Sequence, residues 1–219
     1  MASPKNPNHL LVEGPDDKFA VVELMAHHIG WPEHRVPVWI DSLNGVNNLL
    51  KSDILETRLT NPDIKRLGIL LDADGTPSDR YGELRDALSS ECPELPAFLP
   101  AEGFVSTVSV KTLGSPMRLG IWMMPNNESP GYLEDFLSTL IPGGAKPVWD
   151  HAQQSTRTAR QVGATYKEAH TAKAEMHTWL AWQDLPSPSA GWSLNRKALD
   201  PFLPAATPFV TWFRRLYEV

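Results

Sequence analysis

Four acidic residues stand where an apolar, strand-like run gives way to a turn or a helix. Glu13 follows the apolar run at residues 9–12, and Asp17 comes four residues later. Asp72 and Asp74 follow a second apolar run. Carboxylates gathered at one point repel one another, and a hard cation such as Mg²⁺ or Mn²⁺ relieves that repulsion. Because such a cation keeps bound water for phosphate chemistry, these residues predict metal-dependent chemistry on phosphate esters.

The elements around these acids predict an α/β fold. Strands are expected over residues 9–12, 36–40 and 67–71, and helices over residues 16–29, 46–59 and 79–89. The alternation predicts a mostly parallel sheet flanked by helices. Ligands bind outside the carboxyl ends of the strands in such a sheet. Glu13 and the Asp72–Asp74 pair are therefore expected at one edge, with Asp17 one helical turn past Glu13.

The second half of the sequence changes character. Further strands are expected over residues 103–108 and 118–124, and further helices over residues 132–141, 149–162 and 166–183, before an apolar segment at residues 209–217. We therefore expect an α/β domain over residues 1–142. A mainly helical extension over residues 143–219 is expected to pack on it.

Composition narrows the function classes. The 219 residues carry a net charge of −6, which argues against a protein that coats nucleic acid by charge alone. It does not exclude a nuclease, because bound cations cancel part of an acidic site's charge. Cys92 is the single cysteine, so a disulfide framework and a cysteine zinc site are excluded. No secretory or membrane-spanning run is visible, and a cytoplasmic location is expected.

Two motifs resemble those of the Toprim family. Residues 11–18, Leu-Val-Glu-Gly-Pro-Asp-Asp-Lys, resemble the first Toprim motif, a strand that ends in Glu-Gly with an acid four residues after the Glu. Residues 70–74, Leu-Leu-Asp-Ala-Asp, resemble the second, Asp-x-Asp after a buried strand. Asn44 and Gly45 resemble the turn found at that point in overcoming-lysogenization-defect (OLD) nucleases. The resemblance implies a Toprim, Rossmann-like fold.

Later segments resemble a Toprim-like family of prokaryotic proteins (DUF3226-like) related to OLD-type nucleases. They are Ile-Trp-Met-Met-Pro-Asn-Asn at residues 121–127, Gly-Tyr-Leu-Glu-Asp-Phe at residues 131–136, and the helical stretch at residues 173–183. With the two Toprim motifs, these segments cover nearly the whole chain.

The resemblance implies roles for individual residues. Glu13 and Asp17 match the first-motif acids that hold one metal, and Asp72 and Asp74 match the Asp-x-Asp metal ligands. Glu134 or Asp135, which open a helix after a strand, are candidates for a further metal ligand. OLD-type nucleases also use a late lysine, and Lys173 is the candidate for it. His177, one turn past Lys173, is expected to be structural.

The resemblance implies Mg²⁺-dependent phosphodiester hydrolysis of DNA or RNA, with Glu13, Asp72, Asp74 and Lys173 as the catalytic residues. By analogy with other Toprim effectors, a role in phage defence or repair beside a partner protein such as an ATPase is expected. Arg157, Arg160 and Lys167 form a modest basic set, for which a solvated helix face is the first interpretation and phosphate contact the alternative.

Two other functions compete with the nuclease. Asp72-Ala73-Asp74-Gly75-Thr76 also fits the haloacid-dehalogenase phosphatase motif, in which the first Asp is a nucleophile and the second a general acid. That motif normally opens its fold, whereas two strands and two helices precede it here, and it leaves Glu13 unexplained. The third hypothesis is a non-catalytic module or partner subunit that binds a metal with a nucleotide or a nucleic-acid end.

Overall fold

The structure is a computed structural model that describes residues 6–31, 37–187 and 189–219. Within these residues, five strands form one sheet: β1 (Asn8–Val12), β2 (Trp39–Ser42), β3 (Arg66–Asp72), β4 (Phe104–Val110) and β5 (Ser115–Met124). The α-helices are α1 (Pro15–Ile29), α2 (Val46–Leu49), α3 (Ser52–Leu59), α4 (Pro77–Leu88), α5 (Leu133–Ser138), α6 (Lys146–Gln161), α7 (Thr171–Ala181) and α8 (Thr207–Tyr217). Short 3₁₀ turns are η1 (Gly143–Ala145), η2 (Glu168–His170) and η3 (Pro204–Ala206).

The sheet has the order β2-β1-β3-β5-β4. β1 pairs in parallel with β2 and β3, and β3 pairs in parallel with β5. β4 runs antiparallel to β5 at the sheet edge, because a tight turn that includes Gly114 joins the two strands directly. The predicted α/β class, with a mostly parallel sheet flanked by helices, is confirmed.

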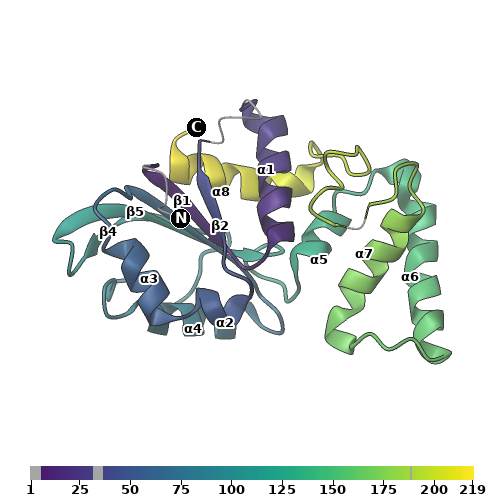
Figure 1. Cartoon of the computed structure of the whole chain (residues 1–219), viewed down its shortest axis with the longest axis horizontal. Coiled ribbons are helices and arrows are strands. Elements are labelled where there is room, and N and C mark those ends of the chain that lie inside the picture. The colour runs from purple at the N-terminus through teal and green to yellow at the C-terminus, as the bar shows by residue number, and fades with distance from the viewer. Residues whose placement is uncertain (1–5, 32–36, 188) are drawn as a thin grey trace.

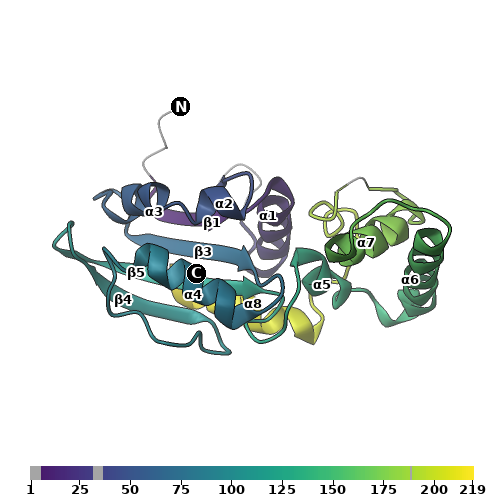
Figure 2. The same ribbon diagram turned by 90° about the horizontal axis from the view of Figure 1, so that it is seen from below.

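Helices cover both faces of the sheet (Figures 1 and 2). Leu10 and Val12 of β1 pack in one cluster with α1 and α8, whereas Leu11 packs in the opposite cluster with α2, α3 and α4. This alternation follows from the two-residue period of a strand. The chain moves from β1 to β2 in one direction and from β2 to β3 in the other. Right-handed crossovers therefore place α1 and α3 on opposite faces.

Helix α8 lies close against the sheet because the facing strands have no side chain there. Gly68 of β3 and Gly120 of β5 are register partners. A methyl group at Gly68 would come within 2.5 Å of Tyr217 Oη, and one at Gly120 within 2.6 Å of Leu216 Cδ2. The Tyr217 hydroxyl donates a hydrogen bond of 2.7 Å to the carbonyl of His9. These contacts fix the helix to β1, β3 and β5.

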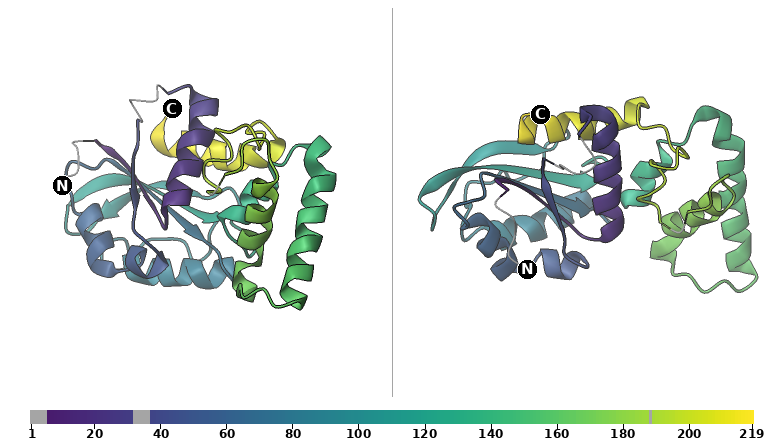
Figure 3. Two further views of the ribbon diagram at one scale, coloured as in Figure 1. Left: turned by 45° about the vertical axis from the view of Figure 1, so that its right-hand side comes forward. Right: turned by 45° about the horizontal axis from the view of Figure 1, so that its top comes forward.

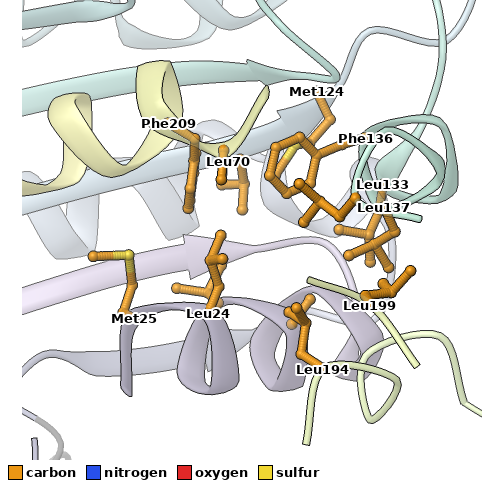
Figure 4. Close-up of a cluster of buried hydrophobic side chains, with 14 of the residues drawn as sticks. Leu24, Met25, Leu70, Met124, Leu133, Phe136, Leu137, Leu194, Leu199 and Phe209 are labelled. Atoms are coloured by element: carbon orange, nitrogen blue, oxygen red, sulfur yellow. The ribbon is translucent and has the colours of Figure 1, made fainter. Parts of the chain in front are cut away.

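The remaining helices extend beyond the carboxyl edge of the sheet. α6 and α7 form an antiparallel hairpin (residues 146–181), shown in Figure 3. Figure 4 shows part of the apolar cluster around α5. In this cluster, Leu133 and Phe136 of α5 pack together with Leu24 of α1 and with Leu199, which lies in the loop between α7 and η3. These side chains join α5 to α1 and to the C-terminal part of the chain. The expected division into an α/β domain over residues 1–142 and a helical extension over residues 143–219 stays a prediction.

Most element boundaries differ from the sequence expectations by one to five residues, as three cases in the first half of the chain illustrate. The second strand begins at Trp39, and Val36, its expected start, lies outside the described residues. The helix expected over residues 46–59 is divided, because Lys51 is extended (ψ 122°) and caps the start of α3. α1 begins at Pro15 rather than at Asp16, since proline lacks the N–H that a first helical residue leaves unused.

Across residues 6–31, 37–187 and 189–219, none of the helices has both the length and the apolar character that crossing a bilayer requires.

Candidate functional site

The predicted acids of β1 and β3 meet at the point where the sheet connections diverge. β1 and β3 are neighbours, and the chain leaves β1 toward β2 on the opposite side. Such a switch point is where ligands bind in open α/β sheets. Glu13 Oε1 accepts a hydrogen bond of 2.9 Å from the Asp72 backbone N–H. Asp72 Oδ1 accepts one of 2.9 Å from the Leu133 N–H, at the start of α5. One chain of contacts thus joins β1, β3 and α5.

Asp17 lies buried in the first turn of α1. Its Oδ2 accepts a hydrogen bond of 2.8 Å from the Gly14 N–H, so the side chain caps its own helix. Asp17 is also close enough to Asp72 for its charge to raise the pKa of that carboxyl. Asp17 is therefore both a helix-capping residue and a member of the acidic cluster.

The pKa values of Glu13, Asp17 and Asp72 are all raised, chiefly by burial. Burial is the main cause that raises the pKa of Asp17, to about 7, and the charge of Glu13 adds to it. Burial also raises the pKa of Asp72 well above its usual range, with the charges of Asp17 and Glu13 next in importance. The pKa of Glu13 is raised for the same first reason. The cluster holds more negative charge than its backbone N–H donors stabilise.

Asp74 reaches the site in an unusual backbone conformation. Its φ is +54°, and its N–H and carbonyl exchange hydrogen bonds of 3.0 and 2.9 Å with Gly131. Its carboxylate forms an ion pair with Arg80, which also contacts Glu83 at 2.7 Å. Arg80 is a site residue that the sequence analysis missed, because an arginine in the first turn of a helix carries no distinctive motif.

A cavity of about 170 Å³ collects most of these groups; its lining residues are Glu13, Asp72, Asp74, Tyr132, Glu134, Ala169, His170 and Lys173. Tyr132 and His170 were not predicted. Their signals are slight: Tyr132 stands two residues before Glu134, and His170 three before Lys173. A larger hollow of about 480 Å³ lies over α4, but it does not include the carboxylate cluster. We assign the site from its chemistry rather than from its size.

The structure separates the two candidates on α5. Glu134 is buried, lines the cavity and lies 3.4 Å from Lys173 Nζ. Asp135 caps the helix instead, since its Oδ2 accepts a hydrogen bond of 2.8 Å from the Tyr132 N–H. Burial is the largest single influence on the pKa of Lys173 and lowers it, but the charge and hydrogen bond of Glu134, together with the charges of Asp16 and Asp72, outweigh burial and the pKa is raised. His177 is not among the residues that line the cavity.

The donor chemistry of the cavity fits a hard divalent cation. In the described part of the chain, no group of three or more His, Cys, Asp or Glu side chains is arranged as a ready metal cage. Mg²⁺ does not need one, because it usually binds one or two protein carboxylates and keeps several waters. Glu13, Asp72 and Asp74 supply carboxylate oxygens to the cavity. The magnesium or manganese site stays a prediction with a suitable donor set.

Comparison with known proteins places the chain in one family. A family model described as "Protein of unknown function (DUF3226)" matches residues 7–218. No curated protein and no solved structure gives a significant match. Because the matched range takes in every strand of the sheet, the acidic cavity and the α6–α7 hairpin, the chain belongs to the DUF3226 family.

Proposed function

We propose that this protein is a Toprim-type, metal-dependent nuclease that hydrolyses phosphodiester bonds in nucleic acid. The observation that carries the proposal is the chain of contacts from Glu13 through Asp72 to Leu133 at the carboxyl edge of the sheet. An acid after the first strand and an Asp-x-Asp after the adjacent third strand are the order that Toprim motifs imply. The raised pKa of Asp72 indicates a site that gains from a bound cation.

The side chains have separable roles in this proposal. Glu13, Asp72 and Asp74 would hold the cation, which when bound would acidify a water and offset phosphate charge. Lys173 brings a positive charge to the same cavity and would contact a non-bridging phosphate oxygen. Glu134 positions that ammonium group through their ion pair. Asp17 acts through its neighbours, as a capping residue whose charge increases the need for a cation.

The test is hydrolysis by purified protein with Mg²⁺ or Mn²⁺. Wild type is compared with Asp72→Asn, with Glu13→Gln and with Glu94→Gln, an exposed acid outside the site. Substrates are single- and double-stranded DNA, RNA and a phosphate monoester. We expect cleavage of nucleic acid to fall by more than about 100-fold in the two site variants, because even outer-shell changes at metal sites cost about 10- to 100-fold. Glu94→Gln should cleave like wild type.

Other outcomes of this test name the competing functions. Monoester turnover that Asp72→Asn loses and Glu13→Gln keeps would indicate the haloacid-dehalogenase-like phosphatase. Metal binding without turnover of any substrate would indicate the binding module. Cleavage at the wild-type rate by both site variants would refute the proposed site, provided that circular dichroism shows all variants folded.

A further inference from the structure

The charge of the molecule is unevenly distributed along the chain. Residues 143–181 carry five Lys and Arg against three Asp and Glu, a net charge of +2. The whole chain has a net charge of −6, so the remaining residues carry −8. Within an acidic protein, the α6–α7 hairpin is therefore a region of positive net charge, suited to attract an anion.

Two arginines of this hairpin share a hollow. A cavity of about 500 Å³ is lined by Arg157, Arg160, Gln161, Tyr166, Glu168 and Thr171. The guanidinium of Arg160 lies over the Tyr166 ring, 5.7 Å from its centroid. The Tyr166 hydroxyl donates a hydrogen bond of 3.0 Å to the Thr156 carbonyl, which holds the ring in place. Arg160 is thus oriented by the protein and still 41 % exposed, as an anion-binding side chain must be.

The same short segment lines this basic cavity and the acidic one. Tyr166, Glu168 and Thr171 face the basic cavity. Ala169, His170 and Lys173 face the acidic cavity. Residues of η2 and of the start of α7 therefore line both cavities. Figure 3 shows where this segment lies, at the end of the hairpin beside the loop that joins α6 to α7. An extended anion that follows this segment would reach both cavities.

We propose that the α6–α7 hairpin binds the phosphodiester backbone of a nucleic-acid strand, with Arg157 and Arg160 contacting phosphates next to the one that enters the acidic cavity. The nature of the strand as a substrate rests on the proposed function. A single small phosphate would occupy one cavity, whereas here cationic side chains line both, Lys173 in the acidic cavity and Arg157 and Arg160 in the basic one. Backbone phosphates are the recurring anion that such a row fits, without regard to base sequence.

Glu168 makes the proposal testable in both directions. It is 87 % exposed and lies 3.3 Å from Arg160, so it competes with a phosphate for that guanidinium. An exposed pair of this kind is weak and readily exchanged. Glu175 differs, because it is buried, accepts a hydrogen bond of 2.8 Å from Gln153, and lies 3.7 Å from Arg157. We expect removal of the Glu168 charge to strengthen binding and removal of the arginines to weaken it.

The experiment measures binding of fluorescent oligonucleotides to metal-free protein by anisotropy, over a range of salt concentrations. The probes are single- and double-stranded DNA and RNA. The Arg157→Gln/Arg160→Gln variant should bind about tenfold more weakly. The slope of the logarithm of its binding constant against the logarithm of salt concentration should be shallower by about one to two. Glu168→Gln should bind about threefold more tightly. Arg196→Gln, an exposed arginine away from both cavities, should match wild type.

Binding and cleavage fail in different ways, so the two proposals can be told apart. If wild type cleaves but the arginine double variant binds like wild type, the hairpin proposal is wrong and the nuclease stands. If wild type binds through the arginines but cleaves nothing, the nuclease is wrong and the hairpin proposal stands. Absence of binding by wild type to every probe, or weaker binding by Glu168→Gln, would overturn the hairpin proposal.

Discussion

Charged side chains are largely buried in the acidic cavity and exposed on the hairpin. In the cavity, Glu13 and Asp72 accept hydrogen bonds from backbone N–H groups and are held by the sheet. On the hairpin, Arg157 and Arg160 are 60 % and 41 % exposed and pair with neighbouring carboxylates. Buried like charges lower stability unless something neutralises them, whereas exposed charges are screened by water and salt. Substitutions should therefore change stability in the first region and binding alone in the second.

The largest effect is expected at Asp17. Its pKa is about 7 in the folded protein against 3.8 for the free side chain. Because the folded state holds the proton more tightly, stability falls as the pH rises from about 4 to about 7. Asp17→Asn should remove that penalty and raise the free energy of unfolding at pH 8, without metal, by on the order of 3 kcal/mol. Urea unfolding of wild type and variant at pH 5 and pH 8 measures this difference in the free energy of unfolding.

The hairpin supplies the matched control for this prediction. Arg157→Gln/Arg160→Gln should change the free energy of unfolding by less than about 0.5 kcal/mol at both pH values. A large loss of stability in this double variant, or an Asp17→Asn variant less stable than wild type at pH 8, would break the contrast between the two regions.

Metal should stabilise the cavity in a pH-dependent way. Binding of Mg²⁺ requires ionised carboxylates, and burial favours their protonated forms, so the metal must displace protons. At about 100 times its dissociation constant, Mg²⁺ should raise the free energy of unfolding by about 2.7 kcal/mol at pH 8 and by much less at pH 5. Thermal unfolding with and without Mg²⁺ measures this. Asp72→Asn should show little response; an equal response in wild type and variant would place the metal elsewhere.

A smaller loss of stability is expected at the contact between the two regions. Lys173 of α7 lies 3.4 Å from the buried carboxylate of Glu134 on α5. Lys173→Gln should lower the free energy of unfolding by about 1 kcal/mol, because it leaves Glu134 buried without its partner and Lys173 itself is half exposed. In a Glu134→Gln background the same change should cost almost nothing. Additive effects in this double-mutant cycle would show that the pair does not couple the regions.

Sequence patterns predicted the parts of the fold that rest on local chemistry. The apolar run at residues 67–71 became β3, and the helix expected over residues 16–29 ends at Ile29, where Gly30 follows with a left-handed φ of 68°. The direction of β4 and the break at Lys51 depend on tertiary pairing, which a local pattern does not contain. The apolar segment at residues 209–217 was recognised. Where it docks could not be predicted, because the space it occupies is left by Gly68, which is far away in the sequence.

Sequence patterns located the acids of the site, and the family resemblance pointed to Lys173, but the other basic residues were not found. Glu13 and Asp72 stand at strand ends, and parallel pairing brings strand ends together. The pairing of Arg80 with Asp74 and the arrival of His170 beside the carboxylates depend on how α4 and the hairpin pack. Arg157 and Arg160 were first interpreted as a solvated face, because nothing in the sequence of α6 shows that Tyr166 and Glu168 complete a hollow with them.

Helix α8 has a consequence for how the protein is made. The apolar residues that it buries on the sheet include Phe209, Trp212 and Leu216, and Tyr217 bonds to His9 at the other end of the described chain. During synthesis, that face of the sheet lacks its cover until residue 217 has left the ribosome. Until then the nascent chain exposes the apolar side chains that α8 later covers, and a chaperone that holds unfolded chains would gain most by binding there.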